Sequence, residues 1–145
     1  MDGLTDRRQR IATHEAGHAV MAIALGCRVR GADVDAAWWS GGRVDADLPA
    51  EGRERRLVTA AGIAAVGLVL GAEDVAHADR AELGDDLEAA VTEALEILAK
   101  RRNIRRLGRV SAALLRDGHL DERQIAAIAS RRSGAVLAGN AGPLS

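Results

Sequence analysis

The sequence contains no phenylalanine, no tyrosine, two tryptophans, two prolines and one cysteine among its 145 residues. One cysteine cannot form an intrachain disulfide, so a disulfide framework and a cysteine-based zinc knuckle are both excluded. Because aromatic side chains are nearly absent, the core has to be built from Ala, Leu, Val and Ile, which favours closely packed helices. At this length the chain is one domain, long enough to bury a real core.

Excess charge and long apolar runs are also missing. The formal net charge is −1, so bulk charge implies neither a nucleic acid nor an anionic membrane as partner. The longest apolar stretch, residues 57–70, has 14 residues, fewer than the roughly 20 that cross a bilayer. No transmembrane span is therefore expected. The first ten residues, MDGLTDRRQR, have no apolar run after their charges and do not resemble a secretory signal. Together with the lone Cys27, this favours a reducing compartment, and we expect a cytoplasmic location.

The chemically most informative stretch is IATHEAGHAVMAIAL, residues 11–25, which contains an H-E-x-x-H motif. On a helix, His14 and His18 lie on one face, so both imidazoles can reach one metal ion. Glu15 lies beside them and can accept a proton from a metal-bound water. Ala and Leu flank the motif and favour a helix, which Thr5 or Asp6 could cap at its start and Gly26 could end.

The motif also has a plainer interpretation, because its three fixed positions occur by chance in many chains. Here, however, the helix carries apolar residues on its other faces, so two histidines and a carboxylate would lie near a core. Such polar groups are costly to bury without a metal ion or a hydrogen-bonding partner. The sequence therefore predicts a Zn²⁺ site, or a relic of one.

The segment HEAGHAV resembles the zinc-binding helix of the FtsH-type metallopeptidases, which are membrane-tethered, ATP-driven proteases. Ala16 and Gly17 inside the motif and Ala19 after it fit that family better than most other H-E-x-x-H groups. The resemblance extends over most of residues 8–131, although only HEAGH is specific. A shortened counterpart of the family's Gly-Gly-Arg-Ala-Ala-Glu sequence follows at Leu70-Gly71-Ala72-Glu73.

The same resemblance implies a third zinc ligand. GDDLEAA, residues 84–90, is similar to the family's Asn-Asp-Leu-x-x-Ala-Thr segment, whose aspartate completes the site. This similarity assigns the third-ligand role to Asp86, with Asp85 as the cap of a new helix. The alternative is that both aspartates are ordinary N-terminal helix residues favoured by the helix dipole.

The expected fold is mainly α-helical with a small β-hairpin or short sheet, an α+β arrangement around a zincin-like helix. Two or three short strands are expected between Cys27 and Pro49, with Ser40-Gly41-Gly42 as a turn. Trp38 and Trp39 either line a substrate groove or anchor the sheet. Further helices are expected over residues 57–70, 86–102, 103–116 and 121–131, the last opened by a capping box. We expect a peptidase-like domain over 1–132 and a loose, Gly-rich tail over 133–145.

The resulting hypothesis is a zinc metalloendopeptidase in which His14, His18 and Asp86 bind Zn²⁺ and Glu15 is the general base. Without tyrosine, an oxyanion donor could only be another residue such as His77 or His119. No Walker-type phosphate loop is present, so the domain would act without ATP on peptides or flexible protein segments. A separate ATPase or a regulatory partner is possible, as is a homo-oligomer. The alternative is a non-catalytic peptide-binding or regulatory domain that retains the peptidase fold.

Overall fold

The computed structural model describes residues 3–35, 42–74 and 76–131. Helices predominate and accompany a small three-stranded antiparallel sheet, which confirms the expected fold class. The elements, in chain order, are α1 (Gly3–Ala24), β1 (Val29–Asp33), β2 (Arg43–Ala46), α2 (Arg53–Leu70), α3 (His77–Leu83), the 3₁₀ turn η1 (Gly84–Asp86), α4 (Leu87–Leu98), α5 (Arg101–Asp117), β3 (His119–Asp121) and α6 (Glu122–Ser130).

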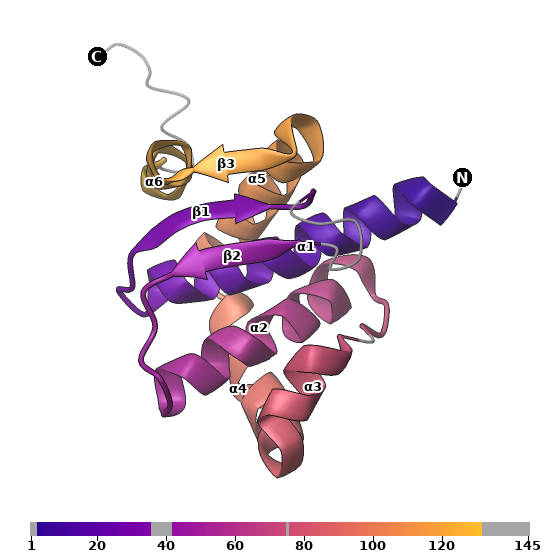
Figure 1. Ribbon diagram of the computed structural model, residues 1–145, viewed down its shortest axis with the longest axis vertical. Coiled ribbons are helices and arrows are strands. Elements are labelled where there is room, and N and C mark those ends of the chain that lie inside the picture. Colours follow the sequence, from indigo (N-terminus) through magenta and orange to yellow (C-terminus); the bar gives the residue numbers. More distant parts are fainter. Residues whose placement is uncertain (1–2, 36–41, 75, 132–145) are drawn as a thin grey trace.

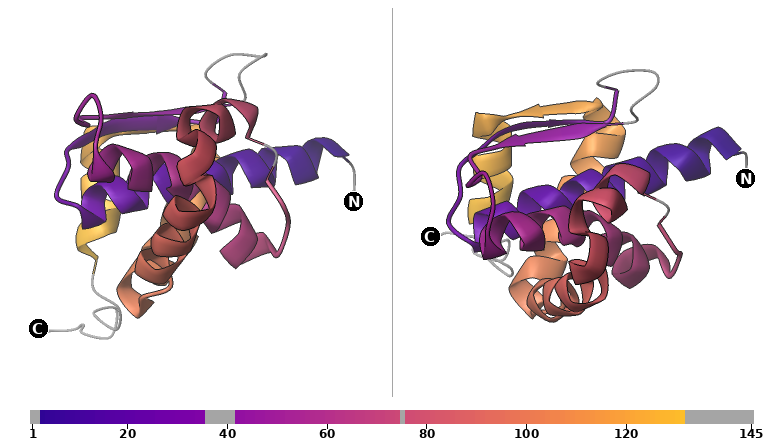
Figure 2. Two further views of the ribbon diagram at one scale, coloured as in Figure 1. Left: turned by 90° about the horizontal axis from the view of Figure 1, so that it is seen from below. Right: turned by 60° about the horizontal axis from the view of Figure 1, so that its bottom comes forward.

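The sheet forms one layer with strand order β2-β1-β3. α1 lies directly beneath this layer, on the side of the sheet where the other helices are (Figures 1 and 2). β1 pairs antiparallel with both neighbours, so β2 lies at one edge of the sheet. Val29 and Ala32 of β1 are buried against the helices. None of the described helices is long and apolar enough to cross a membrane.

Helix α1 is the centre of the fold because small side chains allow its neighbours to approach closely. It packs most extensively against α2 and α5. A Cβ atom added at Gly17 would lie 2.4 Å from the backbone oxygen of Ala61 and 2.7 Å from the Cβ of Ala65. Ala16 and Ala19 are completely buried. The Ala-rich, aromatic-poor composition therefore produces a tight contact between two helices, as the composition predicts.

Several predicted boundaries need correction. α1 begins at Gly3, so Thr5 and Asp6 lie inside the helix and do not cap it. Its end is as predicted, with Gly26 at a φ of 81°. The break between α4 and α5 falls before Asn103, because Asn103 lies in the first turn of α5 and donates from its side chain to the carbonyl of Ile97.

The C-terminal part contains one predicted and one unexpected feature. The capping box is confirmed: the backbone N–H of Gln124 donates to Asp121 at 2.8 Å, and Gln124 accepts from the backbone N–H of Asp121 at 2.8 Å. Strand β3 was not predicted, since three residues are too few to show an alternation. Trp38, Trp39 and most of the expected turn at 40–42 lie outside the described residues, as does the tail from 133.

Candidate metal centre

Both histidines of the H-E-x-x-H motif project from one face of α1, as the four-residue spacing predicts. Their Nε2 atoms lie 2.9 Å apart. Asp79, on α3, places a carboxylate oxygen 2.9 Å from the Nε2 of His14 and 3.3 Å from the Nε2 of His18. Among the described residues, these three side chains form the group whose spacing suits a metal ion.

The spacing and chemistry of this group fit zinc. Ligands at about 2.0–2.1 Å in a tetrahedron are about 3.3 Å from one another, close to the separations of the three polar atoms. Two imidazoles and one carboxylate are a donor set that zinc accepts, and three protein ligands leave one position for water. His14, His18 and Asp79 are thus the residues that could hold the metal.

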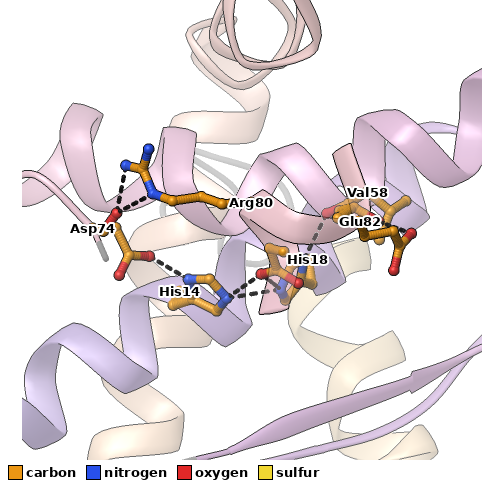
Figure 3. A network of polar contacts seen from close by, with 8 residues as sticks. His14, His18, Val58, Asp74, Arg80 and Glu82 are labelled. Carbon is orange, nitrogen blue, oxygen red and sulfur yellow. Dashed lines mark hydrogen bonds and ion pairs between the residues drawn. The ribbon is translucent and has the colours of Figure 1, made fainter. Parts of the chain in front are cut away.

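The far side of each imidazole is held by the protein. The Nδ1 of His14 contacts the carboxylate of Asp74, which is 7 % exposed. The Nδ1 of His18 lies 2.6 Å from the backbone oxygen of Val58, to which it donates (Figure 3). Such acceptors fix the ring orientation of metal-bound histidines and leave Nε2 free to bind. Both rings are therefore oriented as zinc ligands need to be.

Helix α2 supplies the space for His14 as well as the acceptor for His18. A Cβ atom at Gly62 would come within 2.5–2.8 Å of three ring atoms of His14. A side chain there would push the imidazole away from Asp79. Gly62 thus contributes to the site by having no side chain.

The segment after α2 brings two aspartates to the histidines. Arg80 donates from Nε at 3.1 Å and from Nη2 at 2.7 Å to the backbone oxygen of Asp74. These two hydrogen bonds connect the loop before α3 to α3 itself. Ala76 turns the chain there with a φ of 28°, and α3 then begins at His77, which places Asp79 in its first turn.

The structure does not bring Asp86, the predicted third ligand, to the two histidines. Asp86 is exposed at the end of η1, where it is the N-cap residue of α4 without a side-chain capping bond. The side chain of Asp85, the predicted cap, is also exposed. The physical reason is the separate helix α3, which the resemblance to FtsH-type peptidases did not predict. Helix α3 precedes η1 and α4 in the chain and brings Asp79 to the histidines instead. The alternative interpretation, that Asp85 and Asp86 are N-terminal helix residues, matches their positions.

The electrostatics of the group agree with its geometry. Burial by itself lowers the pKa of His14, but the carboxylates of Asp74 and Asp79 outweigh burial and raise this pKa to about 10. Burial of Asp79 opposes its ionisation, yet hydrogen bonds from His14 and His18 hold its pKa well below the usual range. The cluster thus has a strong affinity for positive charge at the point where the three side chains meet.

Glu15 is 6 % exposed and lies beside the histidines in the same cavity. Burial raises the pKa of Glu15, and the neighbouring His18 and His14 lower it in part. A carboxyl group with a raised pKa is a more effective general base and acid near neutral pH. The three residues predicted from the motif are therefore together.

The cavity has a volume of about 690 Å³ and is bounded by four elements. α1 supplies the motif residues, and the edge strand β2 supplies Val44 and Ala46. Val58 of α2 and Glu82 of α3 line it further along. Of the two candidate oxyanion donors, His77 lines the cavity, whereas His119 lies on β3, 3.2 Å from Asp33, and does not.

Sequence reasoning missed Asp74, Asp79 and Gly62. The segment HADRAE, residues 77–82, carried a signal for Asp79, since Asp79 and Glu82 are one helical turn apart and share a face. No short-range pattern identifies Asp74 or Gly62, because their roles depend on contact with His14 from a distant part of the chain.

Comparison with known proteins does not assign a family: no protein-family model matches the chain, and no curated protein matches it significantly. The functional argument therefore depends on the residues of the site.

Proposed function

We propose that this protein is a zinc-dependent metallopeptidase. The observation that carries the proposal is the convergence of His14 Nε2, His18 Nε2 and the Asp79 carboxylate, with both Nδ1 atoms already engaged. A structural zinc site is closed by four protein ligands, whereas three ligands and an adjacent carboxylate are typical of hydrolytic sites. Glu15 has that adjacent position.

The reaction would divide between the metal and the side chains around it. A bound zinc ion supplies Lewis acidity, which polarises a carbonyl and acidifies a water molecule. Glu15 accepts the proton of that water as it attacks the peptide carbonyl and then gives the proton to the leaving amine. Asp74 and the Val58 carbonyl keep the two imidazoles in position throughout.

The proposed substrate is an extended peptide or a flexible protein segment. β2 lies at a sheet edge and lines the cavity through Val44 and Ala46. An extended chain can add to such an edge by main-chain hydrogen bonds, so that side chains enter the cavity alternately. This arrangement would lay a peptide across His14 and His18.

The resemblance of HEAGHAV to FtsH-type peptidases supports peptide hydrolysis. It does not support the ATP-driven action of that family, because the sequence has no Walker-type phosphate loop. We infer that the domain acts on unfolded segments without ATP, or together with a separate ATPase or regulatory partner. The single Cys27 favours a reducing compartment such as the cytoplasm for this activity.

The test combines zinc content with cleavage. We expect about one zinc per chain in the purified protein, a large loss in Asp79→Ala and no loss in Asp86→Ala, measured by elemental analysis. A peptide library should be cleaved by the wild type and by Asp86→Ala but not by Glu15→Gln. Equal cleavage by the wild type and Glu15→Gln would remove the mechanism. Zinc binding without any cleavage would favour the non-catalytic peptide-binding domain.

A further inference from the structure

One cation at the end of the site cavity has no partner among the described side chains. Arg10 lies one helical turn before His14, so Arg10, His14 and His18 occupy successive turns of one face of α1. Arg10 lines the cavity, and its side chain is exposed. No described carboxylate forms an ion pair with it, whereas Arg8, two residues earlier, pairs with Asp35 at 2.7 Å.

Four acidic side chains line the cavity, and three of them are already engaged by other partners, whereas the fourth, Glu15, forms no ion pair with Arg10 among the described residues. Asp74 and Asp79 contact the histidines. Glu82 accepts from Thr59 at 2.9 Å and from Arg55 at 3.1 Å. The guanidinium of Arg10 thus remains available to a carboxylate that a ligand brings, and such a pair is a charge-assisted hydrogen bond.

Arg43 also lines the cavity but is the weaker candidate. Along β2 the side chains alternate, and Val44 and Ala46 are less exposed than Arg43 and Asp45. This alternation turns Arg43 to the outer face of the sheet. Arg10 is therefore the cation on the same face as the metal site.

The direction of the strand decides which end of a peptide meets Arg10. β2 runs in the same direction as α1, because the chain reverses between α1 and β1 and reverses again between β1 and β2 (Figure 1). Antiparallel pairing is the more common and slightly more stable arrangement for an added strand. A peptide bound antiparallel to β2 has its carboxyl end towards the start of α1, where Arg10 lies.

The distance along the helix decides how near to the scissile bond this contact falls. Four helical residues advance about 6 Å, and an extended peptide advances about 3.3 Å per residue. The Arg10 backbone is thus about two peptide residues beyond His14. We propose that Arg10 binds a carboxylate of the peptide on the carboxyl-terminal side of the scissile bond, an inference that rests on the proposed function. The enzyme then prefers peptides whose chain ends about two residues after the scissile bond, or that carry an acidic residue at that position.

The test uses two pools of random-sequence hexapeptides that differ only in a free or an amidated carboxyl end. Immobilised Glu15→Gln protein, supplied with zinc, is incubated with each pool, and retained peptides are quantified by mass spectrometry. Arg10→Gln and Arg10→Lys are made in the same background. Arg56→Gln is the matched control, because Arg56 is exposed on α2 and does not line the cavity.

We expect the pool with free carboxyl ends to be retained about fivefold more than the amidated pool. The expected factor is modest because Arg10 is exposed, and an exposed ion pair contributes less to binding than a buried one. Arg10→Gln should reduce the ratio to about one, Arg10→Lys should keep part of it, and Arg56→Gln should leave it unchanged. If an acidic side chain supplies the carboxylate, the retained peptides of the amidated pool are enriched in Asp and Glu near the carboxyl end, and Arg10→Gln removes that enrichment.

Two outcomes overturn the proposal: a preference that persists in Arg10→Gln, and no preference for either source of carboxylate, which includes no retention at all. Cleavage by protein with Glu15 intact separates this proposal from the previous one. If cleavage depends neither on the carboxyl end nor on Arg10, the peptidase proposal stands and the carboxylate contact is wrong. If retention depends on Arg10 but no peptide is cleaved, the carboxylate contact stands and the peptidase proposal is wrong.

Discussion

At the scale of single residues, the site depends as much on a missing side chain as on those present. Gly62 faces His14 so closely that a Cβ atom would lie 2.5 Å from the ring. We expect Gly62→Ala to displace the imidazole and weaken zinc binding about tenfold or more, measured by competition with a chelator. Gly67→Ala on the same helix is the control, since its Cβ would meet nothing closer than 4.0 Å. Equal zinc affinity in the two variants would contradict this role.

Asp74 carries a second prediction at this scale. Its carboxylate orients His14 through Nδ1, and loss of such an outer contact typically weakens metal binding about 10–100-fold. Asp74→Asn keeps the shape but removes the charge, so zinc affinity should fall within that range while the circular dichroism spectrum is retained. Glu73→Gln is a neighbouring control, because the Glu73 side chain is 89 % exposed. An unchanged zinc affinity in Asp74→Asn would count against the orienting contact.

These residues also show what the sequence could reveal about the site. His14, Glu15 and His18 were predictable because one helical turn holds all three. Asp79 and Asp74 come from a segment some 60 residues away, and their contact with His14 depends on how α2 and α3 pack. The resemblance to the FtsH-type peptidases pointed to Asp86 instead, because a motif match cannot detect an intervening helix.

At the scale of elements, the contact between α1 and α2 holds in place the helix that carries His14 and His18. Gly17 lies between the two histidines in the chain and packs against the backbone of Ala61. A methyl group there would force a rigid backbone apart, at a cost of about 1–3 kcal/mol in the free energy of unfolding. Gly17→Ala should show this loss in chemical denaturation. Gly108→Ala, at an open helical position, should instead be stabilising by about 0.5–1 kcal/mol. A neutral Gly17→Ala would mean that the helices can separate freely.

The elements also differ in how well their sequences specify them. Long apolar or periodic segments, such as those of α2 and α5, were predicted, because many buried positions repeat along them. β3 and α3 were not, because three and seven residues carry little periodicity. Their positions come from tertiary pairing: Leu120 lies opposite Ala32 across the sheet, and Asp79 contacts the histidines.

At the scale of the whole molecule, the site joins α1 to α3, and α2 supports it through the contact of Val58 with His18. A metal that binds only the folded chain stabilises the fold in proportion to its affinity. Chelation should therefore lower the melting temperature of the wild type and leave that of His18→Ala nearly unchanged, as measured by calorimetry. An identical decrease in both proteins would show that the chelator acts elsewhere.

The protonation of His14 gives this stabilisation a pH dependence. In the metal-free protein Asp74 and Asp79 raise the pKa of His14 from 6.5 to about 10, so the folded chain binds more protons than the unfolded chain between these values. The associated stability is complete below about pH 6.5 and is lost as the pH rises towards 10. Zinc displaces the same proton, so the stabilisation by zinc should grow over this range. Denaturation of metal-free protein from about pH 6 to about pH 9 should show a decline that His14→Gln lacks. A decline of equal slope in His14→Gln would assign the effect to other groups.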